Sequence, residues 1–167
     1  MVWIWSPYRR STCRVASSTS SSPGESFENW ETLVTHSQQL DKMPPGATLV
    51  GRKVLEVDSG TGVVRLAFVA RPEFANRHGT VSGGFLAAML DSATAAPILA
   101  FLAEDLTVVT TDLHVSFKRP APLGELFGTG RVLKQDDREI HSEGELSDPE
   151  GNAVARATAT FRIVRRR

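Results

Sequence analysis

The 167-residue sequence contains a single cysteine, no excess of charge of either sign and no internal repeat. Cys13 alone cannot form a disulfide within the chain, and it excludes a zinc site built from cysteines. Nineteen Lys and Arg residues balance nineteen Asp and Glu residues, which argues against nonspecific nucleic-acid binding, because that requires clustered cations. His36, His114 and His141 have no metal-ligand spacing, and we expect neither a metal nor a cofactor.

The first 24 residues lack acidic side chains and differ in composition from the rest. They carry three arginines and a serine-rich run at residues 17–22, a composition that resembles an organelle transit peptide, and they have no continuous apolar stretch of a secretory signal. The alternative is an upstream start codon or a disordered tail. We exclude this segment from the fold and expect one domain over residues 25–167, which is cytoplasmic, or mitochondrial if the segment is a genuine transit peptide.

The spacing of apolar residues predicts a helix, two strands, a long helix and four strands, in that order. Short turns join neighbouring strands, which favours antiparallel pairing, and the long apolar helix has to be covered. The chain is therefore predicted to adopt an α+β fold in which an antiparallel sheet wraps around a central helix. The predicted helices are residues 25–42 and 83–103, and the predicted strands are 47–57, 62–70, 107–117, 124–134, 139–147 and 153–164.

The predicted helix at residues 83–103 is apolar on all sides and carries one ionisable residue, Asp91. A helix of this kind is enclosed by protein or by lipid. We expect protein, because a carboxylate near the middle of a membrane span costs about 2.5–3.5 kcal/mol on insertion scales. Pro97 is expected to kink this helix or to end its regular part.

A lone carboxylate in such a helix costs several kcal/mol unless it is paired, hydrogen-bonded or hydrated. The neighbours of Asp91 at helical spacing are small, among them Ala87, Ala88 and Ala95, so that face leaves room for another chain or a ligand. Asp91 is therefore a candidate general base. The alternative is a structural aspartate that accepts hydrogen bonds from a neighbouring backbone.

The same helix begins at two glycines, Gly83 and Gly84, after a polar loop. Free N–H groups and the positive end of the helix dipole suit an oxyanion or a polarised carbonyl there. Alternatively, the glycines only permit tight packing. Gly83 and Asp91 lie about 12 Å apart along a helix, so one carbonyl cannot engage both in one chain. If both act together, two antiparallel helices related by a two-fold axis must share the site.

The pattern N-x-x-G-x-x-S-G-G-x₆-D from Asn76 to Asp91, the strand VVTTDLHVSF and the turn SFKRPAPLGE together resemble one family. They are similar to the hotdog-fold acyl-CoA thioesterases of the phenylacetyl-CoA thioesterase (PaaI) type, over about residues 45–164. This resemblance implies a sheet wrapped around a central helix, homodimers that often pair into tetramers, and metal-free hydrolysis of a CoA thioester.

The resemblance also implies roles for individual residues. Asp91 matches the carboxylate that acts as general base or nucleophile, and the Gly83 N–H matches the group that polarises the thioester carbonyl. Asn76 matches a loop asparagine that positions thioester or water, and Thr110 falls where some members place a hydroxyl that orients the water. The residues expected to meet CoA phosphates are Arg138 and, as weaker candidates, Lys118 and Arg119.

One position departs from the family pattern. The family usually has a histidine before the two glycines, and here that residue is Ser82, which can cap the helix but carries no positive charge. His78 is a candidate substitute. We therefore expect an acyl-CoA thioesterase. The alternatives are a non-catalytic protein that binds acyl-CoA or an aromatic ligand, and a hydratase or dehydratase on the same fold.

Overall fold

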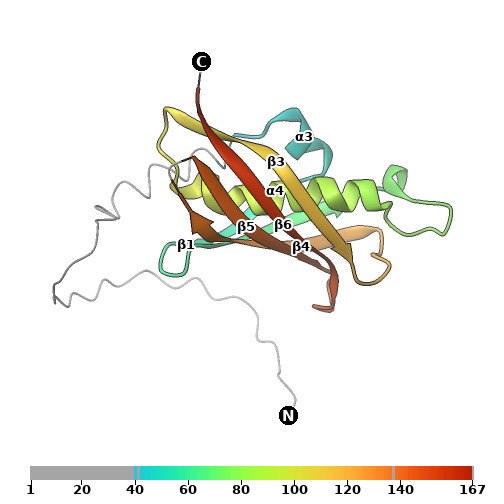
Figure 1. Ribbon diagram of the computed structural model, residues 1–167. Helices are drawn as coiled ribbons and strands as arrows, with labels where there is room; N and C mark the ends of the chain where they lie inside the picture. The colour runs from blue at the N-terminus through green and yellow to red at the C-terminus, as the bar shows by residue number, and fades with distance from the viewer. Residues whose placement is uncertain (1–39, 41, 137, 167) are drawn as a thin grey trace, which may run out of the picture.

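The computed structural model describes residues 40, 42–136 and 138–166, and Figure 1 shows a curved sheet around one long helix. The predicted N-terminal segment 1–24 and nearly all of the predicted helix 25–42 lie outside the described residues. The helices are α3 (Pro45–Leu49), the 3-10 helix η1 (Pro72–Phe74) and α4 (Gly83–Phe101). The strands are β1 (Lys53–Asp58), β2 (Val63–Ala70), β3 (Leu106–Phe117), β4 (Gly124–Gln135), β5 (Glu139–Ser147) and β6 (Ala153–Arg165).

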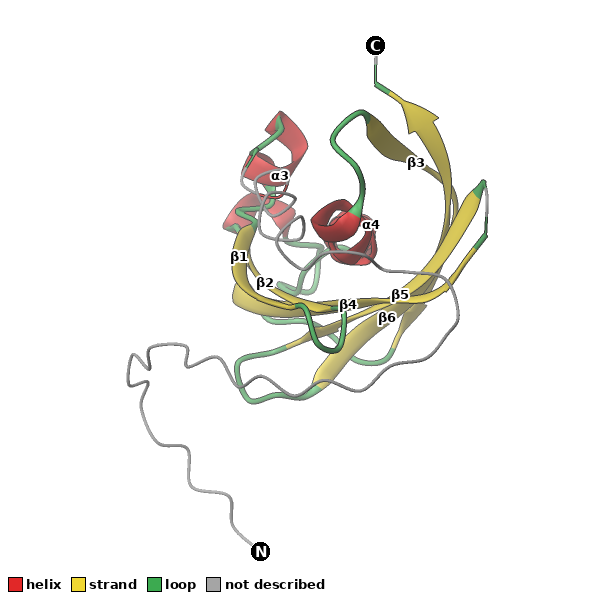
Figure 2. Cartoon of the chain, turned by 90° about the vertical axis from the view of Figure 1, so that its left-hand side faces the viewer, coloured by secondary structure: helices red, strands yellow, loops and turns green. Residues whose placement is uncertain are grey.

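The six strands form one sheet in the order β1-β2-β4-β5-β6-β3, and every neighbouring pair is antiparallel. Figure 2, which looks along α4, shows the sheet curving around that helix. β5 alternates regularly between buried and half-buried residues, as expected for a strand with one face on the core. The predicted α+β fold with a wrapped central helix is therefore confirmed.

Five of the strands pack against α4, whose buried side chains form the centre of the main core with those of β2, β4 and β6. α4 has the length and mean hydropathy, 1.5, of a membrane span, but half of that stretch is buried inside the protein. The helix thus packs as the core helix that the sequence predicts.

Two glycines that face each other across β4 and β5 bring α4 close to the sheet. Gly130 pairs with Gly144, and a Cβ atom on Gly130 would lie 2.0 Å from the carbonyl oxygen of Ala93 in α4. Nearby, the buried Ser142 hydroxyl donates a hydrogen bond of 2.9 Å to the Thr94 carbonyl. The sheet therefore touches the helix backbone itself at this point.

Pro97 lies inside α4, which continues to Phe101, so of the two expected effects of this proline, a kink or an end of the regular helix, the second does not occur. Pro97 has no N–H, so the Ala93 carbonyl one turn earlier has no intrahelical donor. That carbonyl is the one that Gly130 approaches. Packing against the sheet holds the helix together across the proline.

The predicted strand 47–57 is wrong in its first half. Residues Pro45–Leu49 form α3, with Pro45 in the first turn, where a missing N–H is tolerated. The hairpin that follows is as predicted: β1 and β2 pair, and the turn between them is closed by the Asp58 carboxylate. This carboxylate accepts bonds from the Thr61 hydroxyl and from the Gly60 and Thr61 N–H groups, and these bonds lower the pKa of Asp58.

One face of α4 is left partly uncovered by the sheet. We call it the α4 stripe, and its residues, all half-buried or exposed, are Gly84, Ala88, Asp91, Ser92 and Ala95. β3 is an edge strand, paired only with β6 among the described strands. It also exposes two large apolar side chains, Val109 (51%) and Phe117 (55%). An open helix face therefore lies beside an open sheet edge.

Candidate active site

Asp91 lies on the α4 stripe, and a residue of β3 forms a hydrogen bond with its carboxylate. The Thr110 hydroxyl donates a hydrogen bond of 2.7 Å to Asp91 Oδ1. Asp91 is half-buried rather than fully enclosed. The structure thus brings together two of the predicted residues from separate elements.

A break in the strand register occurs beside Thr110. The pairing of β3 with β6 shifts between Thr110 and Asp112, and the extra residue, Thr111, donates its hydroxyl to the Thr160 carbonyl instead. A bulge of this kind re-aims the neighbouring side chains, and bulges are common next to active sites.

If Thr110 orients Asp91, replacing it by valine is expected to lower kcat about tenfold and to leave the KM for substrate nearly unchanged. Valine keeps the shape but cannot donate the hydrogen bond. Thr110→Ser retains the hydroxyl and is expected to restore most of the rate. Steady-state kinetics of both variants test this, and equal rates for the valine and serine variants would contradict it.

The N-terminus of α4 begins at Gly83, with Ser82 in the capping position. The Ser82 hydroxyl forms no capping hydrogen bond, so the expectation that this side chain caps the helix is wrong; its carbonyl instead accepts from the N–H groups of Phe85 and Leu86. In the described part of the chain, no hydrogen bond involves the N–H of Gly83 or Gly84. Among the described residues, neither group therefore has a hydrogen-bond partner within the protein.

Phe117, at the end of β3, lies over the start of α4. A Cβ atom on Gly83 would be 3.0 Å from the tip of the Phe117 ring, while Gly84 faces open space. Phe117 cannot be recognised from the sequence as part of the site, because nothing local links this strand end to a helix start that lies 34 positions earlier.

The Asn76 side chain stabilises the loop before α4 by hydrogen bonds within it. Its amide nitrogen donates to the Thr80 hydroxyl (2.9 Å), and its Oδ1 accepts from the His78 N–H (2.8 Å) and the Thr80 N–H (3.3 Å). This is a loop-building arrangement typical of asparagine in turns. The contact of Asn76 with substrate stays a prediction. The His78 side chain is exposed at the same loop.

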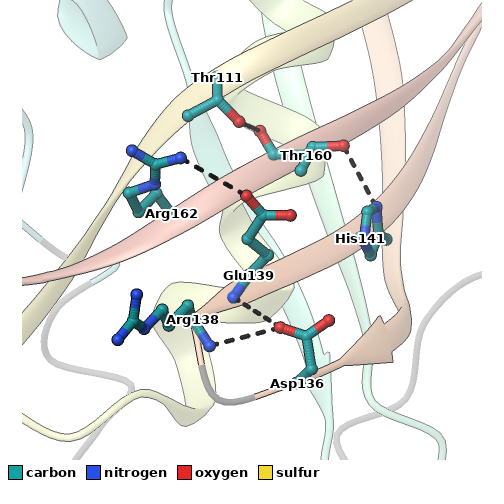
Figure 3. Close-up of polar contacts among 7 residues, drawn as sticks. All are labelled: Thr111, Asp136, Arg138, Glu139, His141, Thr160 and Arg162. Atoms are coloured by element: carbon teal, nitrogen blue, oxygen red, sulfur yellow. Dashed lines mark hydrogen bonds and ion pairs between the residues drawn. The ribbon is translucent and has the colours of Figure 1, made fainter.

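The three predicted phosphate-binding residues lie at two ends of β3. Lys118 and Arg119 directly follow the strand, near Phe117 and Gly83, and both are exposed. Arg138 is at the opposite end, where its carbonyl accepts from the Ile163 N–H. Figure 3 shows the Arg138 guanidinium pointing away from Asp136, whose carboxylate accepts a hydrogen bond from the Arg138 backbone N–H. Within one protomer, Arg138 therefore lies at the opposite end of β3 from Lys118 and Arg119.

A hollow of about 540 Å³ lies on the outer face of the sheet, on the side away from α4. Its charged walls include Arg131 paired with Glu143, and Arg156 paired with Glu145. Neither Asp91 nor Gly83 lines it. The hollow is thus not part of the candidate active site on the α4 stripe.

Comparisons with known proteins agree with the fold. The profile of the thioesterase superfamily matches residues 78–155. A solved structure from Ralstonia eutropha JMP134, a phenylacetic acid degradation-related protein provisionally classed as a thioesterase, is 36% identical, with a TM-score of 0.72; the match covers 76% of this chain and 98% of that one.

Two further proteins are similar to this chain. The Escherichia coli PaaI protein of the phenylacetic acid degradation operon has the same fold, with a TM-score of 0.70 at 18% identity over 80% of this chain and 94% of that one. A protein of Saccharolobus solfataricus provisionally classed as an esterase is 27% identical over 113 residues, covering 68% of this chain and 79% of that protein.

An antiparallel sheet wrapped around one central helix is the hotdog fold, and the thioesterase and esterase relatives place the chain among thioester hydrolases. The chain belongs to the thioesterase superfamily.

Proposed function

We propose that the protein hydrolyses acyl-CoA thioesters in a site shared between two subunits of a homodimer, or of a tetramer built from two dimers. The observation that carries this proposal is the Asp91 carboxylate, held at 2.7 Å by Thr110 and placed on the open α4 stripe. This half-buried acid lies beside helix residues that the sheet leaves exposed, such as Gly84 and Ala88.

The need for two subunits follows from the position of the two groups on one helix. Gly83 begins α4 and Asp91 lies about 12 Å further along it, so a single carbonyl cannot contact both in one protomer. Two α4 stripes that pack antiparallel across a two-fold axis bring Gly83 of one subunit to Asp91 of the other. The edge of β3 that pairs with no described strand, with exposed Val109 and Phe117, supports an interface on this side.

The proposed antiparallel dimer also brings together basic residues that lie apart in one protomer. Lys118 and Arg119 lie at the Gly83 end of the protomer and Arg138 at the other end. An antiparallel partner therefore places its own Arg138 near the first subunit's Lys118 and Arg119. Three cations around one entrance suit the phosphates of CoA.

In the proposed reaction, Asp91 removes a proton from a water molecule whose oxygen adds to the thioester carbonyl carbon. The Gly83 N–H at the positive end of α4 donates to the carbonyl oxygen as its negative charge develops. The carbon–sulfur bond then breaks, and the CoA sulfur leaves as a thiolate that takes up a proton. In the nucleophilic variant of this mechanism, Asp91 attacks the carbonyl carbon itself and water hydrolyses the resulting anhydride.

The proposal is tested by incubating the protein with a panel of short-chain, long-chain and aryl acyl-CoAs and measuring the thiol released. Hydrolysis of at least one of them supports it. Tight binding of acyl-CoA without thiol release would identify a binding protein instead, and water addition to an enoyl-CoA without thiol release would identify a hydratase.

The Gly83 N–H can be removed without removing the helix. Proline is favoured in the first turn of a helix, and Ser82 already has the extended backbone, φ −63° and ψ 138°, that a following proline requires. Gly83→Pro is therefore expected to lower kcat by about 10²-fold or more, the usual effect of losing one oxyanion donor.

Gly83→Ala is the matched control, because it adds a Cβ at the same place beside Phe117 but keeps the N–H. It is expected to retain much more activity than Gly83→Pro. Equal rates for the two variants would show that crowding against Phe117, and not the N–H, limits the reaction.

A further inference from the structure

Phe117 is the one aromatic residue among the large apolar side chains that stay exposed in the described part of the chain. Its exposed fraction, 55%, is also the highest in that group. Two other phenylalanines near the start of α4, Phe74 and Phe85, stack on each other with 3.9 Å between ring centroids, and neither is exposed. An open aromatic ring offers a large, rigid apolar surface to a ligand or to another protein. What lies next to Phe117 therefore decides its role.

The Phe117 ring is held beside the first residue of α4. Three atoms at the end of the ring lie 3.0, 3.4 and 3.5 Å from the place that a Cβ on Gly83 would take. Phe117 ends β3, and the backbone after it is fixed, because the N–H groups of Lys118 and Arg119 donate to the Val154 carbonyl at 2.9 and 3.3 Å. A side chain at position 83 would displace the ring, so the two positions are matched to each other.

The ring also lies close to the atoms that react in the proposed function. A thioester oxygen that accepts a hydrogen bond from the Gly83 N–H lies about 2.9 Å from that nitrogen, and the sulfur on the same carbonyl carbon lies within roughly 6 Å of it. The end of the Phe117 ring is beside the same residue. A short chain attached to the sulfur is therefore long enough to reach the ring.

The residues after Phe117 indicate which part of the substrate passes the ring. Lys118 and Arg119 follow it directly, are exposed, and belong to the cations proposed to meet the phosphates of CoA. In CoA, the pantetheine arm joins the reactive sulfur to those phosphates. An arm that runs from Gly83 toward these two cations passes Phe117, and its uncharged methylene and methyl groups suit an apolar ring. The acyl group leaves the same carbonyl carbon in another direction.

We propose that Phe117 is a substrate-binding residue that contacts the pantetheine arm of CoA between the Gly83 N–H and the phosphate-binding cations. This inference rests on the proposed function, because it takes the thioester carbonyl to be bound at Gly83. Phe117 then contributes to recognition of the leaving group and not of the acyl group. Loss of the ring weakens the binding of CoA thioesters whatever acyl group they carry, and it weakens the binding of the free thiol as well.

Pantetheine is the probe that separates these contacts, because it has the arm but neither phosphates nor an acyl group. Its inhibition constant against butanoyl-CoA hydrolysis is expected to rise at least about fivefold in Phe117→Ala. Because pantetheine is itself a thiol, hydrolysis is followed by the loss of thioester absorbance. The ratio of kcat/KM for dodecanoyl-CoA to that for butanoyl-CoA is expected to change less than about twofold. An unchanged inhibition constant, or a changed ratio in its place, would overturn the inference.

Two variants serve as controls. Leu55→Ala removes an apolar side chain of similar exposure, 48%, from β1 at the opposite edge of the sheet, and it should leave both measurements unchanged. Lys118→Ala is expected to weaken inhibition by CoA but not by pantetheine, which has no phosphate for it to bind. If Lys118→Ala weakens inhibition by pantetheine as much as Phe117→Ala does, the ring has no specific contact and the inference is overturned. Phe117→Leu, a smaller change, is used in the same tests if Phe117→Ala does not fold.

Calorimetric titration with pantetheine gives a reading that does not depend on turnover. The dissociation constant is expected to rise at least about fivefold in Phe117→Ala and to stay unchanged in Leu55→Ala, with the oligomeric state of the wild type retained in both. Loss of the oligomer in Phe117→Ala would make the ring an interface residue and overturn the inference. If the wild-type protein hydrolysed no acyl-CoA, the proposed function would fail, whereas the titration would still decide whether Phe117 binds the arm.

Discussion

Replacing Asp91 by asparagine is expected to lower kcat for acyl-CoA hydrolysis by about 10³-fold or more. Asparagine has nearly the same shape, and its Oδ1 can still accept the hydrogen bond that the Thr110 hydroxyl donates at 2.7 Å. It cannot take a proton from water, and it is a poor nucleophile. The geometry of the site therefore survives while the chemical step is lost.

The measurement is thiol release under saturating substrate, together with the oligomeric state of the variant in solution. Asp105→Asn is the control, since Asp105 is an exposed aspartate beyond the C-terminal end of α4 and has no assigned role. It should leave kcat unchanged. An Asp91→Asn protein that keeps more than about a tenth of the wild-type kcat would remove Asp91 from the chemical step.

Gly130→Ala is expected to cause the largest loss of stability, about 3 kcal/mol or more in the free energy of unfolding. The added Cβ would lie 2.0 Å from the Ala93 carbonyl oxygen and 3.1 Å from the Pro97 ring. The oxygen belongs to the α4 backbone, so no side-chain rotation relieves the overlap and the helix has to move away from the sheet. For a chain of this size, we expect a fall in Tm of about 10 °C.

Gly46→Ala provides the control, because Gly46 lies within α3 and a Cβ there has nothing within 4 Å. Alanine in a helix is favoured over glycine, so this variant is expected to be as stable as the wild type or slightly more stable. Thermal unfolding of both variants tests the pair. A Gly130→Ala protein with an unchanged Tm would mean that α4 does not rest on the β4 backbone as described.

Much of the fold can be predicted from the sequence because its signals are local. Four strands and the hairpin follow from apolar spacing and turn residues, and α4 from one uninterrupted apolar run. Two features of the fold do not follow from such local signals. α3 is too short for a periodic pattern, and α4 continues past Pro97 because the sheet supports it. The contact of Gly130 with Ala93 leaves no trace in the sequence, because a glycine in a strand does not reveal which backbone approaches it.

The candidate site, too, can be predicted from the sequence only in part. Asp91 is detectable because an acid in an apolar helix is a local anomaly, and Gly83 because a double glycine begins that helix. The pairing of Asp91 with Thr110 required the family resemblance, since the two residues meet only through a strand edge and its bulge.

The central claim is that one subunit supplies Asp91 and its partner supplies the Gly83 N–H. Mixing the Asp91→Asn and Gly83→Pro proteins after dissociation and reassociation tests it most directly, because each variant alone is expected to keep at most about one hundredth of the wild-type kcat. In a mixed dimer with a shared site, one of the two sites combines an intact Asp91 with an intact Gly83. Random reassociation of equal amounts should then restore about one quarter of the wild-type activity. No recovery in a preparation shown to contain mixed dimers would place both groups in one chain and contradict the account.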